Sequence, residues 1–127
     1  MSSRLAITVE GDRALRVIRP EGELDISTVG ALAPVVEREC SSHADLVVDL
    51  SRLSFLDCAG LRILLYARAL ADSNGSRLRL VPGPASVRRI FRLTGLESRF
   101  NFVAPAATRR FRRRVDVALT APASDRA

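Results

Sequence analysis

The chain has 127 residues, 47% of them hydrophobic, which suits a single compact domain that folds around one core without a metal ion or disulfides. It carries 20 basic residues, all of them arginine, against 14 acidic residues, and its formal net charge is +6. Only 5% of the residues are aromatic and tryptophan is absent, which argues against a base-stacking or sugar-binding surface.

The excess of positive charge is concentrated at the C-terminal end. Residues 105–127 contain six arginines and two aspartates, a net charge of +4 out of +6, which leaves +2 for residues 1–104. We therefore divide the chain into a domain at 1–104 and a basic segment at 105–127. Nucleic-acid binding is not expected of the domain, although non-specific phosphate contacts by the arginines of residues 109–114 remain an alternative.

The sequence lacks the features of a metalloprotein, a secreted protein or a membrane protein. The two cysteines, Cys40 and Cys58, do not have the spacing of a metal site or a redox pair. The first twelve residues carry charges and no apolar signal-peptide core. The longest apolar stretch, residues 61–71, is shorter than a membrane span and is interrupted by Arg68. We expect a cytoplasmic protein with no cofactor, no metal site and no membrane insertion.

The chain begins with the pattern of a β-hairpin. Apolar and polar residues alternate over residues 4–9 and again over 14–19, and Glu10, Gly11 and Asp12 between them supply a turn. Apolar residues then recur at helical spacing from Val29 to Cys40.

This spacing predicts a helix that follows the hairpin. Asp25 or Ser27 is placed to cap its N-terminus, and Glu37 and Glu39 are expected on its outer side.

Further strands and helices alternate along the rest of the domain. They are predicted at 45–50, 58–72, 77–81, 84–94 and 100–103, with a loop at 51–57. The predicted order is β-β-α-β-α-β-α-β, in which strands separated by helices run parallel. This order predicts an α/β fold, with a mixed four- to five-stranded sheet and helices packed against it.

The basic C-terminal segment allows two interpretations. Phe111, Val115, Ala118 and Leu119 have the spacing of an amphipathic helix, which predicts a C-terminal helix over residues 106–120. The alternative is a frayed basic tail.

The segment from Asp49 to Leu61 joins a buried strand to the start of a helix, where ligands and partners often bind a parallel sheet. Asp57 is well placed to cap that helix. Gly60 lets its first turn lie close to another backbone or to a small anion. Phe55 is either part of the core or a surface anchor for a partner.

Three segments together resemble the STAS domain, which bacterial anti-sigma-factor antagonists share. Residues 47–61 (VVDLSRLSFLDCAGL) resemble the signature of this family, and residues 22–25 (GELD) and 87–96 (VRRIFRLTGL) also match. The resemblance covers about residues 4–103 and implies a STAS-type fold. It also implies partner switching, in which the protein binds an anti-sigma factor of the histidine-kinase-like ATPase type, so that a sigma factor is freed and transcription is regulated. In the family, this kinase ends the interaction by phosphorylating a serine in the loop.

The chain departs from the family at that serine, because Cys58 occupies the position of the phosphorylated residue. A thiol is not an ordinary substrate of a serine kinase. Ser51 and Ser54 are nearby hydroxyls, but the resemblance does not mark them as acceptors. We expect Gly60 to be exposed at the helix start and Leu61 to anchor the helix from beneath. The expected partner-binding residues are Asp25, Ser54, Phe55, Asp57, Cys58, Gly60 and Leu61.

Catalysis by Cys58 would require partners that the sequence does not place beside it. A phosphatase loop needs arginine six positions after the cysteine, where this chain has Leu64, and the only histidine, His43, precedes the previous strand. We therefore expect a binding protein and not an enzyme, with no catalytic residues. A redox-sensing protein, a STAS scaffold of a stress complex and a nucleic-acid-binding protein with a basic tail remain alternatives.

Overall fold

The computed structural model describes residues 4–108 in full and the backbone of residues 115–122. Within these residues the chain forms strands and α-helices that alternate after an initial hairpin, together with two short 3-10 turns, η1 (Glu97–Arg99) and η2 (Pro105–Thr108). The strands and α-helices are β1 (Arg4–Gly11), β2 (Leu15–Leu24), α1 (Val29–Cys40), β3 (Asp45–Asp49), β4 (Leu53–Leu56), α2 (Cys58–Ser73), β5 (Leu78–Val81), α3 (Ala85–Leu93), β6 (Asn101–Phe102) and β7 (Val115–Pro122).

The described strands form one mixed sheet. Its order is β6-β5-β3-β2-β1-β7, and β4 pairs with β2 beyond the end of β3. β1 runs antiparallel to β2 and β7, and the other pairs are parallel. The α/β prediction is therefore confirmed, and so is the order of the first hairpin and the three helices. The sheet is larger than predicted because the sequence analysis did not identify β4 and β7.

Strand β2 is longer than predicted because it continues through Pro20 to Leu24. Proline has no N–H group to donate, so it is unfavourable where both neighbouring strands need hydrogen bonds. On one side of β2, however, the pairing with β3 ends at Ile18, and the pairing with β4 begins at Gly22. Pro20 therefore lies in the gap between these two partners, which explains how β2 passes through it.

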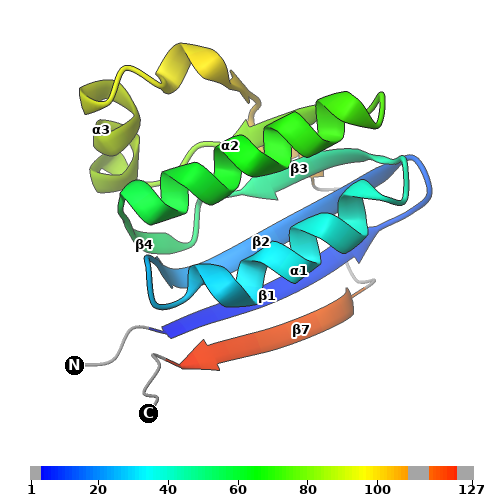
Figure 1. Ribbon diagram of the computed structural model, residues 1–127, viewed down its shortest axis with the longest axis horizontal. Helices are drawn as coiled ribbons and strands as arrows, with labels where there is room; N and C mark the ends of the chain where they lie inside the picture. The colour runs from blue at the N-terminus through cyan, green and yellow to red at the C-terminus, as the bar shows by residue number, and fades with distance from the viewer. Residues whose placement is uncertain (1–3, 109–114, 123–127) are drawn as a thin grey trace.

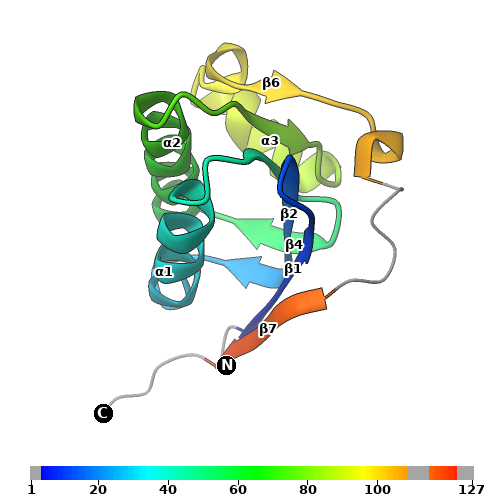
Figure 2. The same cartoon turned by 90° about the vertical axis from the view of Figure 1, so that its right-hand side faces the viewer.

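Helices α1 and α2 cover one face of the sheet, and η2 lies on the opposite side (Figures 1 and 2). Fully buried side chains on the covered face include Leu5, Ile7 and Val9 of β1, which alternate along the strand as predicted. Helix α3 contacts β4 and adds Phe91 to the same core. The ring of Phe91 packs edge-to-face against two further phenylalanine rings at centroid distances of 5.5 Å, those of Phe100 and Phe102.

The other face of the sheet carries a buried ion-pair network. The guanidinium group of Arg19 on β2 donates from Nε to Asp49 Oδ2 on β3 at 3.1 Å and from Nη1 to Glu10 Oε2 on β1. Val17 and Val47, which pair in register beside these residues, are fully buried. The three central strands are therefore joined on this face by charged side chains as well as by backbone hydrogen bonds.

Two expectations about α1 are wrong. Glu39, expected on the outer side, is 4% exposed and pairs with arginines, because Arg16 of β2 lies under the end of the helix. The residue at the N-cap is Thr28, which makes no side-chain cap hydrogen bond, and neither Asp25 nor Ser27 caps the helix. Asp25 instead closes the preceding turn, where its Oδ1 accepts from the backbone N–H of Ser27 at 2.9 Å.

The C-terminal helix predicted over residues 106–120 is also wrong. Residues 105–108 form η2, and Val115–Pro122 form β7, which pairs antiparallel with β1 from Arg4 to Glu10. Pairing satisfies backbone groups along the edge of β1 that a helix would leave unpaired. Val115, Val117 and Leu119 also alternate with the period of a strand, so the sequence pattern fitted both structures. The arginines of residues 109–114 lie outside the described residues.

Candidate functional site

The starts of α1 and α2 lie side by side at one end of the sheet (Figure 1). The parallel pairing of β4 with β2 places Leu56 beside Leu24, so both strands end at the same level. β2 then leads into the turn at Asp25, and β4 leads into Asp57 at the start of α2. Two segments that are more than thirty residues apart in sequence therefore form one surface.

Asp57 caps α2, as predicted. Its side-chain Oδ1 accepts a hydrogen bond from the backbone N–H of Gly60 at 3.1 Å. Its own backbone N–H donates to the carbonyl oxygen of Leu24 at 3.3 Å, which ties the helix start to the end of β2. The cap therefore fixes both the direction of α2 and its position beside the turn that precedes α1.

Gly60 lies inside the domain, and its predicted exposure is wrong. A Cβ atom at this position would lie 2.4 Å from Leu56 Cδ1 and 2.8 Å from the carbonyl oxygen of Leu24. Glycine is therefore required because α2 packs directly against the ends of β2 and β4. The predicted close approach to another backbone is present, but it faces the core. Leu61 is buried beneath the helix, as predicted.

The exposed part of the site combines polar and apolar side chains. Cys58 is exposed at the first position of α2, and Phe55 on β4 is 48% exposed, so Phe55 belongs to the surface and not to the core. Ser54 is exposed, and its hydroxyl group donates to the carbonyl oxygen of Gly22 at 3.2 Å. This hydrogen bond links β4 to β2, which is a structural role for Ser54.

The sequence analysis missed Ile26, which is 76% exposed in the turn before α1. The signal that could have identified it is its isolation, because it is the only apolar residue between Asp25 and Thr28. Ile26 borders a groove of about 360 Å³ between α1 and α2. The other residues that line this groove are Val29, Ala59, Arg62, Ile63 and Tyr66.

Asp25 belongs to the site, but its side chain is engaged in local hydrogen bonds. Its Oδ1 accepts from the N–H and from the hydroxyl group of Ser27, at 2.9 and 2.7 Å. The hydroxyl group of Thr28, fully buried, donates to the carbonyl oxygen of Glu23 at 2.8 Å. These bonds hold the turn in place and leave Ile26 at its exposed tip.

The two cysteines lie in different environments. Cys40 is buried at the end of α1, where burial and, to a lesser degree, the charge of Glu39 raise the pKa of its thiol to about 11. Cys58 is exposed.

His43 lies in the connection between α1 and β3, at the opposite end of the sheet from Cys58 (Figure 1), and is exposed. The histidine is therefore not placed to act as a base for Cys58.

Within residues 4–108 and 115–122, no three side chains of histidine, cysteine, aspartate or glutamate are grouped to hold a metal ion. Nor does any helix in that part of the chain have the length and apolar character needed to cross a membrane.

Comparison with known proteins identifies similarity to one family. Residues 6–118 match the model of the STAS domain family. The structure is similar to an anti-sigma factor antagonist from Mycobacterium paratuberculosis, with 29% identity, 79% of this chain and 86% of that chain covered, and a TM-score of 0.70.

Two structures of SpoIIAA share the fold. The anti-sigma factor antagonist SpoIIAA in its unphosphorylated form is 24% identical, with 80% of this chain and 90% of that chain covered and a TM-score of 0.68. The Bacillus cell fate determinant SpoIIAA in the phosphorylated form is 23% identical, with coverages of 80% and 94% and a TM-score of 0.62.

Proposed function

The chain belongs to the STAS domain family, and from this premise we propose that it is an anti-sigma-factor antagonist. In this role it binds an anti-sigma factor, which then releases its sigma factor. The observation that carries the proposal is the surface formed by Ile26, Phe55 and Cys58 at the starts of α1 and α2. The similarity to an anti-sigma factor antagonist that is 29% identical supports the same role.

The chemistry of this surface suits protein binding. Ile26 and Phe55 are large apolar side chains, exposed by 76% and 48%, and burial against a partner would stabilise a complex by about 1–2 kcal/mol for each. The groove between α1 and α2 adjoins Ile26 and can receive an apolar side chain of the partner. Ser54 and Cys58 add exposed polar groups beside them.

We propose that the partner is an anti-sigma factor of the histidine-kinase-like ATPase type and that this chain performs no catalysis of its own. In the family, the kinase ends the interaction by phosphorylating the residue that corresponds to Cys58. A phosphoserine there would add about −1.5 to −2 charges beside the Asp57 carboxylate, within the contact surface. Cys58 has no hydroxyl group to accept the phosphate, so the complex of this chain is expected to persist in the presence of ATP.

The test compares the wild type with Cys58→Ser, and Cys58→Ala serves as the matched control without an acceptor. Each full-length protein is used to capture partners from an extract, and the purified partner is then incubated with it and ATP. Intact-mass spectrometry reports phosphorylation, and a pull-down reports binding. We expect one phosphate and release for Cys58→Ser only, whereas the wild type and Cys58→Ala remain unmodified and bound.

Three results would contradict the proposal. Capture of salt-sensitive nucleic acid and no ATPase would favour the nucleic-acid-binding alternative. An ATPase that binds but phosphorylates none of the three proteins would contradict the kinase type of the partner. A phosphate on Ser51 or Ser54 of the wild type would show that the acceptor has moved, and the proposed persistence of the complex would then be wrong.

A further inference from the structure

The groove between α1 and α2 is formed by one face of α2 and by the start of α1. The residues that α2 contributes have the spacing i, i+3, i+4 and i+7 of a single helix face. They are Ala59, Arg62, Ile63 and Tyr66. Val29, the first residue of α1, and Ile26 in the turn before it line the other side. The groove therefore begins at the exposed tip of that turn and follows the first two turns of α2.

The deeper part of this groove is apolar. Val29 and Ile63 are half-buried and pack against the main core, whereas Ile26 is 76% exposed and forms part of the rim. Two turns along α2 from Ala59, the hydroxyl group of Tyr66 donates to Glu37 Oε2 at 2.7 Å and so joins α2 to α1. An apolar side chain that enters beside Ile26 would therefore contact both helices.

Arg62 is the only charged residue among the described residues that line the groove. It is exposed and forms no hydrogen bond or ion pair within residues 4–108. It follows Cys58 by four residues, so about one turn of α2 separates the two side chains on the same side of the helix. The groove is therefore continuous with the proposed partner-binding surface and has a positive charge at its rim.

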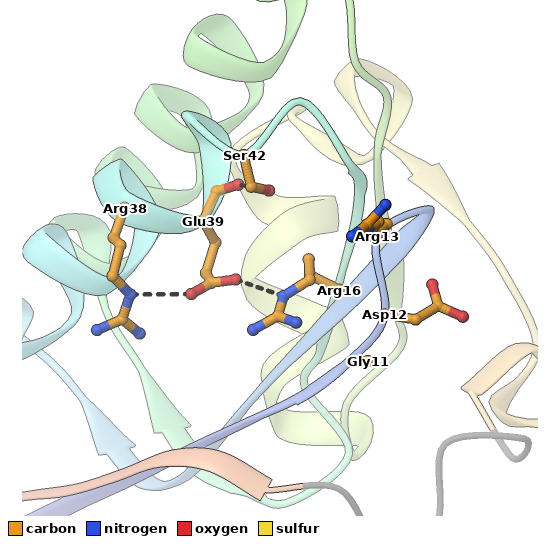
Figure 3. Close-up of a pocket in the computed structure, with 7 residues that line it drawn as sticks. All are labelled: Gly11, Asp12, Arg13, Arg16, Arg38, Glu39 and Ser42. Atoms are coloured by element: carbon orange, nitrogen blue, oxygen red, sulfur yellow. Dashed lines mark hydrogen bonds and ion pairs between the residues drawn. The ribbon is translucent and has the colours of Figure 1, made fainter.

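The arginines at the opposite end of the sheet provide a contrast. In the pocket between the β1–β2 turn and the end of α1, Glu39 accepts hydrogen bonds from Arg16 Nε at 2.7 Å and from Arg38 Nε at 2.9 Å (Figure 3). Both of these guanidinium groups already have an acidic partner within the chain. Arg62 has no such partner in the part of the chain that the structure describes, so a complementary acid would come from another molecule.

We propose that this groove binds a segment of the anti-sigma factor in which a large aliphatic side chain lies beside a carboxylate, and that the carboxylate pairs with Arg62. The inference rests on the proposed function and names the chemistry that the partner presents. Entry of the aliphatic side chain removes apolar surface from water, and a guanidinium group can donate two parallel hydrogen bonds to a carboxylate. Nucleic acid fits less well, because its phosphates require several basic residues and the described lining has one.

The test uses the ATPase that the wild type captures from the extract, after purification, and measures its affinity for variants of the full chain by isothermal titration calorimetry. Ile26→Ser removes an apolar group at an exposed position, and Arg62→Gln removes the charged donor. Each is expected to weaken binding about tenfold. Arg62→Lys keeps the charge and should recover part of the loss, whereas Arg62→Glu should weaken binding more than Arg62→Gln.

Arg77→Gln is the matched control, because it removes the same charge from an exposed position beyond the far end of α2. It should bind as the wild type does, and thermal unfolding checks that each variant is folded. Equal weakening by Arg77→Gln and Arg62→Gln would show that only net charge matters and would overturn the inference.

Unchanged binding of Arg62→Gln would overturn the pairing with a carboxylate, and unchanged binding of Ile26→Ser would overturn the apolar contact. In each of these cases the ATPase still binds the wild type, so the inference fails while the proposed function stands. If the wild type captures no ATPase, both fail together.

Discussion

Gly60 is the position where a single added methyl group should separate packing from helix propensity. In Gly60→Ala, the new Cβ atom would lie 2.4 Å from Leu56 Cδ1, 2.8 Å from the carbonyl oxygen of Leu24 and 3.1 Å from Leu24 Cγ. The Leu56 methyl group can move, but the Leu24 oxygen belongs to the backbone of β2 and accepts a hydrogen bond from Asp57. The variant must therefore shift the start of α2 away from the sheet.

Two opposing effects determine the magnitude. Replacement of glycine by alanine within a helix stabilises it by up to about 1 kcal/mol. Overpacking at a site in contact with backbone costs about 1–3 kcal/mol, and the two shortest contacts here place the cost in the upper part of that range. The net expectation is a loss of about 1–2 kcal/mol in the free energy of unfolding.

Gly30 on α1 is the matched control. Like Gly60 it lies in the first turn of a helix, but unlike Gly60 it is exposed. A Cβ atom at Gly30 would have no atom of another part of the chain within 4 Å. Gly30→Ala should therefore show the propensity effect alone, a gain of about 0.5–1 kcal/mol. Urea unfolding followed by circular dichroism measures both variants, and a change in midpoint with an unchanged slope reports stability. If Gly60→Ala is as stable as Gly30→Ala, the close packing of α2 against β2 is refuted.

Further predictions concern the buried charges and the two thiols. Arg19→Met should cost about 3 kcal/mol, because it leaves two buried carboxylates unpaired, and urea unfolding against the control Arg52→Met, whose ion pair is exposed, measures it. Iodoacetamide at pH 8 should alkylate Cys58 and spare Cys40, whose raised pKa of about 11 keeps the thiol protonated and whose side chain is buried. Mass spectrometry reads the result, and rapid alkylation of Cys40 in the folded protein would contradict its burial. The stability that protonated Cys40 contributes is present below its ordinary pKa of about 9 and is lost as pH rises through about 11, and unfolding of Cys40→Ala over that range should lack this loss.

Features that depend on local sequence were predicted correctly. The cap by Asp57 needs only an acidic side chain at the N-cap and the free N–H groups of the first turn, which lie within three residues of each other. The burial of Leu61 follows from the 3.6-residue period of α2, and the alternation of β1 follows from the two-residue period of a strand. These periods are visible in the sequence, so helix positions and one face of the core could be predicted from them.

Features that depend on distant residues were not predicted. Ser54 and Phe55 of β4 are both exposed, so this strand has no alternation and exists because its backbone pairs with β2. Glu39 lies on the buried face of α1, four residues after Val35, but a carboxylate is favourable there only because Arg16 from β2 pairs with it. Gly60 is similar, because two of the three atoms nearest to an added Cβ belong to Leu24, thirty-six positions away in sequence, and one of them is a backbone oxygen.

Leu24 explains why the proposed partner-binding surface is already formed in the free protein. Its carbonyl oxygen accepts from the N–H of Asp57, its side chain and backbone pack against Gly60, and it precedes the turn that carries Ile26. One fully buried residue therefore fixes the start of α2, and with it Cys58, relative to that turn. A surface held in this way loses little conformational entropy when a partner binds. A protein that acts by binding benefits directly from such preorganisation, because more of the interaction free energy then contributes to affinity.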